Sequence, residues 1–357
     1  MKSDIMGTME TKVFVARDNY INDEELKEAS AVIRSGGLVA FPTETVYGLG
    51  GDALNAESSA KIYAAKGRPS DNPLIVHIAD MDALPFIAAE IPESAYLLAN
   101  AFWPGPLTMI FKKTDRVPMA TTGGLSTVAV RMPSNKIAAA LIRAAGGYIA
   151  APSANRSGRP SPTVAKYVIE DLDGRVEMII DGGSSDIGLE STIIDLSEGE
   201  PMILRPGYVT REKMMQVIGK VDVDRTILDA SSGQAPKAPG MKYRHYAPKG
   251  NLTIVEGPQE KVIACINEKL AEGHEQGLKT GVIATDETIE QYQADVKRSL
   301  GSRKNEDAIA HHLFEVLRQM DDEEVQLIFT ESFTETGLGQ ATMNRLLKAA
   351  GHQVISL

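Results

Sequence analysis

The chain has 357 residues, of which 43% are hydrophobic and 24% charged, and 48 acidic side chains outnumber 37 basic ones. This composition excludes a disordered or collagen-like chain, and the length predicts two or three domains with buried cores. The single cysteine, Cys265, excludes an intramolecular disulfide framework and a Cys-based zinc site, and the net charge of −11 argues against nucleic acid or an anionic membrane as a direct partner.

No membrane-spanning or secretory segment is predicted. No stretch has the ~18–20 uninterrupted apolar residues of a membrane helix, and the first dozen residues lack the apolar core of a signal peptide. Because a chain with one cysteine suits a reducing compartment, we expect a cytoplasmic protein without a membrane partner.

The first 210 residues alternate between helical and strand-like patterns. Asn22 is placed to cap a helix that stops at Gly36-Gly37, and Asn55 to cap the next helix. The mixture predicts an α/β domain with a mixed sheet. Helices are expected over residues 23–35, 56–65, 93–101, 135–145 and 163–172, and strands over 38–41, 74–78, 107–113, 127–132, 148–151, 176–180, 191–196 and 202–204.

The pattern changes after a Gly-, Pro- and Ser-rich stretch at residues 231–250, whose composition is typical of a linker. Strands and helices then alternate regularly, which predicts a small, doubly wound parallel sheet. Its strands are expected over residues 252–255, 281–284, 325–330 and 354–357, and its helices over 259–273, 307–320 and 340–350.

The first motif that suggests chemistry is FPTETVYGLGGDA at residues 41–53, where a buried strand runs into a polar, glycine-rich turn. Residues 48–53 match G-x-G-x-x-A, a weak dinucleotide pattern, but the next helix is expected only near Asn55. A loop that needs backbone freedom also explains the glycines. The polar run Thr43-Glu44-Thr45 indicates a strand end that faces a ligand.

The second motif is KGRPSDNPL at residues 66–74. Lys66 and Arg68 follow the end of a predicted helix, where cations either stabilise the helix terminus or bind a polyphosphate or a carboxylate. Asn72 and His77 lie close by in the sequence. His77 alternates into an apolar strand, so it is either a core histidine or part of the site.

The third motif is APSANRSGRPSPT at residues 151–163, between a strand and a helix. Small hydroxyl and amide side chains in such a loop suit an anion, although a solvated loop has the same composition. No Walker A sequence occurs in the chain, so any ATP site is not of the P-loop type. The candidate donors are Ser153, Asn155, Ser157 and Ser161.

Further candidates lie at strand ends and in the linker. Arg131 ends a strand with a buried face, so it needs a partner and is a candidate carboxylate clamp. Ser191 opens one strand and Arg205 closes another. Residues 242–246, KYRHY, combine cations with aromatic rings and would suit a segment that folds over a nucleotide.

Charge is unevenly distributed along the chain. Residues 1–250 carry a net −3 and residues 251–357 a net −8, yet residues 101–168 hold nine Lys and Arg against one acid, Asp115. This basic stretch is either a solvated face or part of a site for an anionic ligand. Most of the net negative charge lies in residues 251–357, where we find no candidate catalytic or binding residues.

Together these motifs resemble the threonylcarbamoyl-AMP synthase family in its two-domain form. The resemblance rests on PTETVYGLG, KGRPSDNPL, VAVRMP, APSANRSG and PGMKYRHYAP, in this order and spacing. It implies a YrdC-like twisted mixed sheet with helices over residues 12–210, a linker over 211–250, and a small Rossmann-like parallel α/β domain over 251–357. The family's Lys-x-Arg and Ser-x-Asn tetrad stands here as Lys66, Arg68, Ser153 and Asn155.

The resemblance also implies a reaction. L-threonine, bicarbonate and ATP would give threonylcarbamoyl-AMP, pyrophosphate and water, with Mg²⁺ expected to accompany ATP and no dedicated metal cage in the protein. A tRNA threonylcarbamoyl transferase would receive the product, with little direct tRNA binding by this chain. The residues implied for threonine are Thr45, His77, Arg131, Ala151 and Ser191. Those implied for ATP are Lys66, Arg68, Asn72, Thr127, Ser153, Asn155, Ser161, Arg205, His245 and Tyr246.

Two other functions fit parts of the sequence. The basic stretch at residues 101–168 suits an RNA-binding module without ATP turnover, which would bind RNA in a salt-sensitive way. The match at residues 48–53 and the alternating second half suit an NAD-dependent enzyme. The net charge disfavours the first, and the missing G-x-G-x-x-G after the first strand of the second half disfavours the other.

Overall fold

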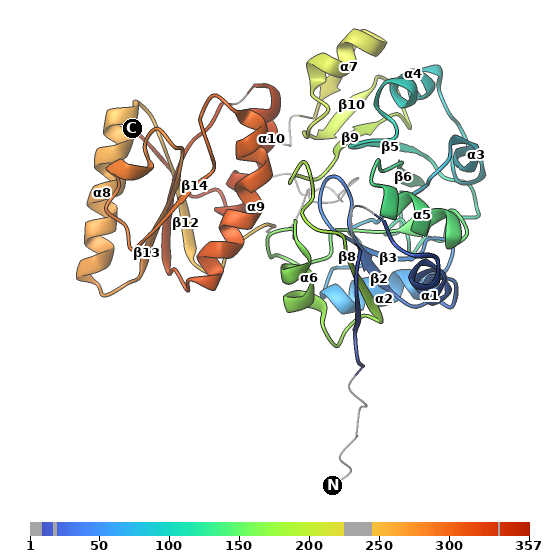
Figure 1. Cartoon of the computed structure of the whole chain (residues 1–357). Helices are drawn as coiled ribbons and strands as arrows, with labels where there is room; N and C mark the ends of the chain where they lie inside the picture. Colours follow the sequence, from blue (N-terminus) through green and yellow to red (C-terminus); the bar gives the residue numbers. More distant parts are fainter. Residues whose placement is uncertain (1–8, 17–19, 225–244, 335) are drawn as a thin grey trace.

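A computed structural model describes residues 9–16, 20–224, 245–334 and 336–357. They form an eleven-stranded mixed sheet followed by a five-stranded sheet, each covered by helices (Figure 1). The mixed α/β architecture expected from the sequence is therefore confirmed. Among the described residues, no helix has the length and apolar character needed to cross a bilayer.

The large sheet and its helices extend to residue 223. The strand order is β1-β8-β2-β3-β7-β4-β6-β5-β9-β10-β11. Its strands are β1 (Lys12–Val15), β2 (Val39–Phe41), β3 (Gly48–Asp52), β4 (Ile75–His77), β5 (Leu107–Lys112), β6 (Thr127–Arg131), β7 (Ile149–Ala150), β8 (Met178–Asp181), β9 (Thr192–Asp195), β10 (Met202–Arg205) and β11 (Asp222–Val223). Its helices are α1 (Asp23–Arg34), α2 (Ala56–Lys66), α3 (Leu84–Ile87), α4 (Glu93–Phe102), α5 (Lys136–Ala144), α6 (Ala165–Leu172) and α7 (Arg211–Ile218), with a 3₁₀ turn at Met81–Ala83.

The helix starts follow the capping residues seen in the sequence. The Asn22 side chain accepts a hydrogen bond from the Glu25 backbone N–H at 2.9 Å, and Asn55 caps α2 in the same way through Glu57. Helix α2 ends at Gly67, whose φ of 63° places it in the left-handed conformation that glycine adopts without strain.

Strand β3 is the main departure from the expected turn at residues 48–53. Gly48–Asp52 pairs antiparallel with β2 and is buried over four of its five residues. A Cβ added at Gly50 would lie 2.7 Å from the Phe41 ring and 2.8 Å from the Ile149 side chain, so glycine is needed here for close packing. The dinucleotide interpretation of this segment is wrong, because no helix begins inside the motif.

Residues 211–223, expected in the linker, contain α7 and β11. Strand β11 pairs in parallel with β10, and α7 packs against α4, so both complete the large sheet rather than leave it. Strand β1 at the other edge was also not anticipated from the sequence. The division of the chain into domains stays a prediction. Because β11 belongs to the large sheet, the end of the first domain, expected at residue 210, would lie beyond residue 223.

The second sheet is wholly parallel, in the order β14-β13-β15-β12-β16. Figure 1 shows α8 on its outer face and α9 and α10 on the face toward the large sheet, which confirms the doubly wound pattern. Strand β14 and a short 3₁₀ turn at Ile289–Gln291 were not expected. Its elements are β12 (Asn251–Glu256), α8 (Gln259–Glu275), β13 (Thr280–Ala284), β14 (Val296–Ser299), α9 (Glu306–Asp322), β15 (Leu327–Glu331), α10 (Gly337–Ala349) and β16 (Val354–Ser356).

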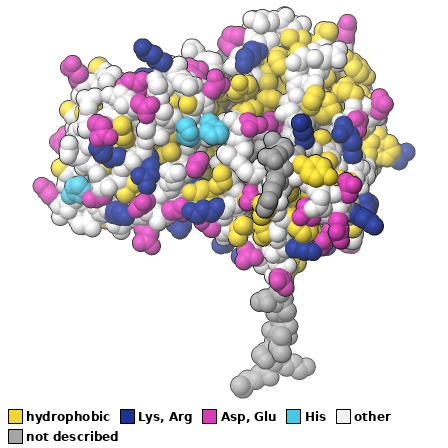
Figure 2. All heavy atoms as spheres, in the orientation of Figure 1, with side chains coloured by type: hydrophobic (Ala, Val, Ile, Leu, Met, Phe, Trp, Pro, Cys, Tyr) yellow, Lys and Arg dark blue, Asp and Glu magenta, His cyan; other side chains and the backbone are white. Residues whose placement is uncertain are grey.

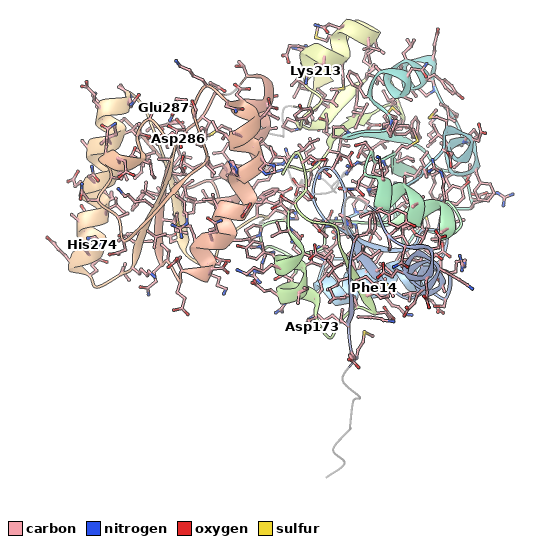
Figure 3. The ribbon with its side chains drawn as sticks, viewed as in Figure 1. Phe14, Asp173, Lys213, His274, Asp286 and Glu287 are labelled. Carbon is pink, nitrogen blue, oxygen red and sulfur yellow. The ribbon has the colours of Figure 1, made fainter. Side chains whose placement is uncertain are left out.

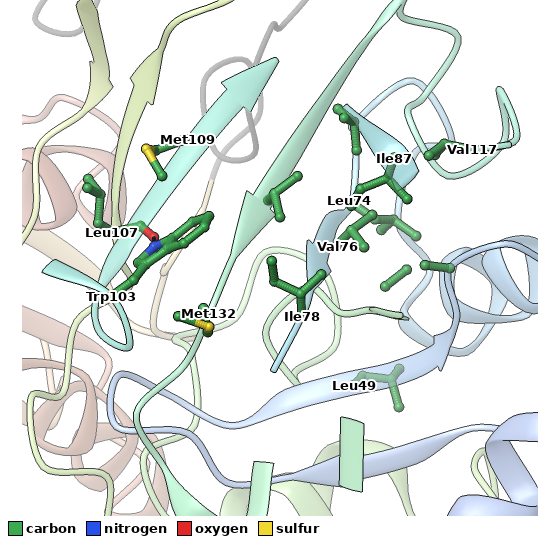
Figure 4. Packing of buried hydrophobic residues seen from close by; sticks show 14 of the residues in the cluster. Leu49, Leu74, Val76, Ile78, Ile87, Trp103, Leu107, Met109, Val117 and Met132 are labelled. Atoms are coloured by element: carbon green, nitrogen blue, oxygen red, sulfur yellow. Dashed lines mark hydrogen bonds between the residues drawn. The ribbon is translucent and has the colours of Figure 1, made fainter. Parts of the chain in front are cut away.

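The core of the large sheet holds the strands that carry the candidate site. Leu49, Leu74, Val76 and Ile78 belong to one buried cluster (Figure 4), and each of these four is less than 2% exposed. The Trp103 indole N–H at the rim of this cluster donates to the Leu107 carbonyl at 2.7 Å. Burying such side chains stabilises a domain by about 1.5–3 kcal/mol each, which fixes the strand ends to which the site is attached.

Candidate active site

Several strand ends meet at one edge of the large sheet. His77 and Arg131 are the last residues of parallel strands β4 and β6 and are register partners. Strand β9 runs opposite to β6 and β10 opposite to β9, so Ser191 before β9 and Arg205 at the end of β10 reach the same edge. The sheet topology therefore gathers side chains that are more than a hundred residues apart in the sequence.

A cavity opens at this edge. It is bounded by the β2–β3 turn, the end of α2, the loop after β7, and the strand ends described above. All the predicted site residues except Asn72 and Thr127 line it. They are Thr45, Lys66, Arg68, His77, Arg131, Ala151, Ser153, Asn155, Ser161, Ser191, Arg205, His245 and Tyr246.

Asn72 and Thr127 lie outside this lining. Asn72 is buried, and its Oδ1 accepts a hydrogen bond from Arg68 Nη2 at 2.6 Å, so it orients a lining residue. Thr127 is the first residue of β6, and Arg131 at the cavity is its last; at about 3.3 Å per residue they lie about 13 Å apart. Direct contact of either side chain with ATP stays a prediction.

One end of the cavity pairs a buried arginine with a buried acid. Arg131 Nη1 donates to Thr45 Oγ1 at 2.8 Å, and Nη2 lies 2.7 Å from Glu44 Oε1. That ion pair lacks hydrogen-bond geometry, and Arg131 Nε and Nη2 and both Glu44 oxygens are buried without a hydrogen-bond partner. Such groups are costly to bury unless a ligand completes them. A donor and an acceptor of opposite charge are what the carboxylate and ammonium of an amino acid require.

His77 stands beside Arg131 and is 3% exposed. Burial, aided by the positive charge of Arg131, lowers the pKa of its imidazole to about 3. The ring is therefore neutral at pH 7, and its Nδ1 lies 3.1 Å from the Ile75 carbonyl. This histidine is buried in the sheet and also lines the cavity, so a role in the site stays a prediction.

Lys66 holds the loop after β7 in place. Its Nζ donates to the carbonyl oxygens of Ser153 and Asn155, each at 2.5 Å, and Ser153 Oγ donates to Asn155 Oδ1 at 2.5 Å. Burial and the neighbouring Arg68 charge lower the pKa of the lysine well below its usual range. Three members of the expected tetrad, Lys66, Ser153 and Asn155, are therefore joined by hydrogen bonds, and the fourth, Arg68, lines the same cavity.

Arg68 and Arg205 add two guanidinium groups to the same half of the cavity. Arg205 donates from Nε and Nη2 to the Ser191 carbonyl at 3.1 and 2.9 Å, and Arg68 donates to Asn72 and Pro73. Burial lowers the pKa of each guanidinium to about 10, which leaves both charged at pH 7. With Lys66 they make this half suitable for a polyphosphate.

Glu190 is a lining residue that the sequence analysis missed. Its Oε1 accepts from Ser161 Oγ at 2.5 Å, and its Oε2 accepts from Arg345 Nε at 3.1 Å. Burial opposes ionisation, but the charges of Arg345 and Arg205 outweigh it and lower the pKa of this carboxyl. Its partner Arg345 lies far along the chain in α10, so no local pattern pointed to it.

His245 and Tyr246 enter the cavity from the predicted linker. Residues 242–244 of the same motif lie outside the described residues. Burial lowers the pKa of His245 to about 3, with Arg68 the largest of the charges that add to the effect, and its Nε2 is buried without a hydrogen-bond partner. The Tyr246 ring lies 5.0 Å from the ring of Phe314 in α9, so this segment is packed against the second sheet.

The basic stretch at residues 101–168 does not form one cationic face. Acids from outside the stretch pair with five of its nine cations, and Figure 2 shows acidic and basic side chains interspersed on the face it presents. This arrangement weakens the case for an RNA-binding surface. The pairs are Lys112–Glu90, Arg131–Glu44, Arg143–Asp80, Arg159–Asp171 and Lys166–Asp322.

A dedicated metal site is not evident in the parts of the chain that the structure describes, where no three His, Cys, Asp or Glu side chains cluster. Among the described lining residues, Glu190 is the sole acid, and it is already bound by Ser161 and Arg345. The donor set therefore fits a magnesium ion only if phosphate oxygens and water supply most of its ligands.

Comparison with known proteins gives matches over both regions. Residues 31–207 match a family model described as Telomere recombination, and residues 209–351 match one described as Threonylcarbamoyl-AMP synthase, C-terminal domain. A protein of Pyrococcus abyssi named threonylcarbamoyl-AMP synthase is 50% identical over 94% of this chain and 97% of its own. The chain belongs to the threonylcarbamoyl-AMP synthase family.

A further family member and a solved structure support the match over nearly the whole chain. The Bacillus subtilis threonylcarbamoyl-AMP synthase is 47% identical over 98% of this chain and all of its own. The crystal structure of Pyrococcus abyssi Sua5 complexed with L-threonine superimposes with a TM-score of 0.92 at 49% identity, covering 97% of this chain and 100% of that one. Both sheets therefore belong to the shared fold.

Proposed function

We propose that the protein makes threonylcarbamoyl-AMP from L-threonine, bicarbonate and ATP, with release of pyrophosphate and water, for threonylcarbamoyladenosine modification of tRNA. Its family membership makes it an enzyme, an L-threonylcarbamoyladenylate synthase of the nucleotidyltransferase class. The observation that carries the substrate assignment is the division of one cavity into two chemically different halves. One half holds Arg131, whose Nε is buried without a hydrogen-bond partner and whose Nη2 pairs with Glu44 outside the lining, and the other gathers Lys66, Arg68 and Arg205.

The threonine half is assigned to Thr45, His77, Arg131, Ser191 and the backbone at Ala151. Arg131 Nε and Nη2 have N–H groups to give to a carboxylate, and charge-assisted hydrogen bonds of this kind are the strong ones. The neutral imidazole of His77 adds no second cation that would repel the substrate ammonium. The complex of the Pyrococcus relative with L-threonine agrees with this choice of amino acid.

The ATP half is assigned to the cationic cluster, to the hydroxyl of Ser161, and to His245 and Tyr246 as a cover over the nucleotide. The lining residues of the ATP half would hold the phosphates and exclude water. Threonine and bicarbonate-derived carbon dioxide would first form a carbamate. Its oxygen then bonds to the α-phosphorus while the bond from that phosphorus to pyrophosphate breaks.

No protein side chain needs to become covalently attached in this scheme. Catalysis would come from placing the carbamate oxygen in line with the leaving pyrophosphate and from neutralising developing charge, both of which fixed cations do well. Glu190 and Ser161 would be the lining residues available to a magnesium ion, which would supply charge neutralisation for the phosphates when bound with ATP. A tRNA threonylcarbamoyl transferase would take the product.

The proposal is tested by measuring pyrophosphate release from ATP with the full chain, omitting threonine, bicarbonate and ATP in turn. Release is expected only when all three are present, and mass spectrometry should detect threonylcarbamoyl-AMP in the same mixtures. Folded protein that releases no pyrophosphate with all three substrates would contradict the proposal. Release that is independent of threonine would point to a different acceptor.

A further inference from the structure

Two arginines of the second sheet reach into the walls of the cavity without lining it. Arg318 lies in α9 and Arg345 in α10, the helices that face the large sheet in Figure 1, and both side chains are 0% exposed. Fully buried arginines are rare unless every donor has a partner. The partners of these two lie on the large sheet.

Arg345 ties together two of the strand ends at the cavity. Its Nε donates to Glu190 Oε2 and its Nη2 to the Glu190 carbonyl, both at 3.1 Å, while Nη1 donates to the Pro206 carbonyl. Glu190 directly precedes Ser191, and Pro206 directly follows Arg205. One guanidinium therefore fixes the spacing between two residues that line the cavity.

Arg318 makes an equivalent set of contacts to the loop after β7. Its Nε and Nη2 donate to the Pro160 carbonyl at 3.0 and 2.6 Å, and its Nη1 and Nη2 donate to the two Asp171 oxygens at 3.2 and 2.6 Å. Asp171 also accepts from the backbone N–H of Arg156 at 3.0 Å. The wall that ends in Ser161 is thus held from α9.

We propose that Arg345 is a positioning residue for the nucleotide half of the cavity, so that the second sheet completes the active site through α10, with Arg318 in the same role for the loop after β7. The inference rests on the proposed function. In this arrangement the second sheet supplies the charge that balances Glu190 and the donors that set the positions of Ser161, Ser191 and Arg205.

The charge balance predicts which substrate is affected. Without Arg345, the Glu190 carboxylate would lie buried beside Ser161 and Arg205 with its main counter-charge gone. It would repel the phosphates of ATP and compete for Arg205, whereas Arg131 at the threonine end would keep its contacts. The defect should therefore appear mainly in ATP binding.

The experiment uses the full chain and four variants. Arg345→Met should raise KM for ATP and the calorimetric Kd for ATP about 10- to 100-fold, with a smaller change in KM for threonine, since a broken buried ion pair leaves an uncompensated charge. Arg345→Lys, which keeps the charge but not the forked contacts, should fall between it and the wild type. Arg345→Met combined with Glu190→Gln should recover most of the ATP affinity.

Arg303→Met is the matched control. Arg303 is also an arginine of the second sheet paired with a buried acid, Glu331, but it lies within that sheet. The Arg303→Met substitution should change KM for ATP less than about twofold. Like Arg345→Met, it removes the arginine that pairs with a buried carboxylate.

Two results would overturn the inference: an Arg345→Met variant whose ATP affinity equals that of Arg303→Met, or a double variant as weak as Arg345→Met alone. If Arg345→Met does not fold, Arg345→Lys decides by the same comparison. A wild-type chain that binds ATP but releases no pyrophosphate would instead contradict the proposed function, and the calorimetric comparison would still test the inference.

Discussion

Buried charged side chains are bonded less completely at the edge of the large sheet than in the second sheet. At the edge of the large sheet, Arg131 and Glu44 are buried with donors and acceptors left over. In the second sheet, the buried Glu331 accepts a hydrogen bond from the Tyr292 hydroxyl at 2.6 Å and pairs with Arg303. A buried polar group without a partner costs about 1–3 kcal/mol, so we expect a ligand to complete the first arrangement. Unfinished polar contacts distinguish the binding region from the supporting one.

Charged side chains on the surface of the second sheet also have bonding partners close by. Figure 3 places His274, Asp286 and Glu287 on the second-sheet side of the molecule, and each has a local partner. His274 pairs with Asp295, and Asp286 accepts from Ser299. Hydrogen bonds from Ser302 and the Arg303 backbone lower the pKa of Glu287 to about 2. Each of these acids is therefore bonded to local partners in the second sheet's own region.

Removing a cavity cation should give the largest effect and would sharpen this contrast. Lys66→Ala and Arg131→Ala should each lower kcat/KM by about 100-fold or more, because positioning and charge neutralisation are lost together. Lys61→Ala, at an exposed position of the same helix α2, should retain near wild-type turnover. Pyrophosphate release and thermal unfolding should be measured in parallel. Wild-type turnover in either cavity variant would refute the assigned role.

The close packing of β3 gives the next largest effect, on stability rather than binding. Gly50→Ala should reduce the free energy of unfolding by about 1–3 kcal/mol, because its Cβ would overlap Phe41 and Ile149. Gly48→Ala in the same strand is the control, since its Cβ would meet neighbours at an ordinary 3.4 Å. Urea unfolding measures both. Equal stabilities would mean that the Gly50 contacts relax without cost.

The packing of Tyr246 against Phe314 tests whether the two regions act together. Tyr246→Ala and Phe314→Ala should each weaken ATP binding by about tenfold, because either change removes the support of the segment that we propose covers the nucleotide. Phe86→Ala is the control, since Phe86 stacks on Tyr148 outside the cavity lining. If Phe314→Ala binds ATP normally, the second sheet does not support this cover.

The buried histidine should give the smallest effect, a change in the pH dependence of stability. The unfolded chain protonates His77 below about pH 6.5, whereas the folded protein resists protonation down to about pH 3. Stability is therefore full above pH 6.5 and falls as the pH is lowered toward 3. Between pH 7 and pH 5.5 this histidine should cost about 1 kcal/mol. His77→Gln should flatten that part of the curve relative to wild type, and identical curves would count against the shifted pKa.

Local patterns predicted most of the fold. The caps at Asn22 and Asn55, the alternation after residue 251, and the apolar strand at residues 74–78 each depend on neighbours within a few residues, so the sequence exposes them. Strands β1, β11 and β14 were not predicted, because each is short and takes its structure from pairing with another strand. The glycines of β3 suggested a turn, since only the rings packed against them show why the side chain is absent.

Site residues that stand together in short motifs were predictable from the sequence, and a residue whose partners are distant in the sequence was not. Lys66, Arg68, Ser153 and Asn155 stand in two compact motifs. The structure joins Lys66, Ser153 and Asn155 by hydrogen bonds, and Arg68 lines the same cavity. Glu190 was missed, because the meaning of a buried acid depends on its partners. Those partners, Ser161 and Arg345, come from segments that only the assembled fold brings together.

The order of residues along the chain gives the placement of Arg345 a consequence for protein synthesis. A ribosome extends a protein from its N-terminus, so every strand of the large sheet is made before α10. A growing chain that has completed this sheet still carries Glu190 without the arginine that offsets it. We expect the affinity for ATP to reach its full value only after α10 has folded against the large sheet.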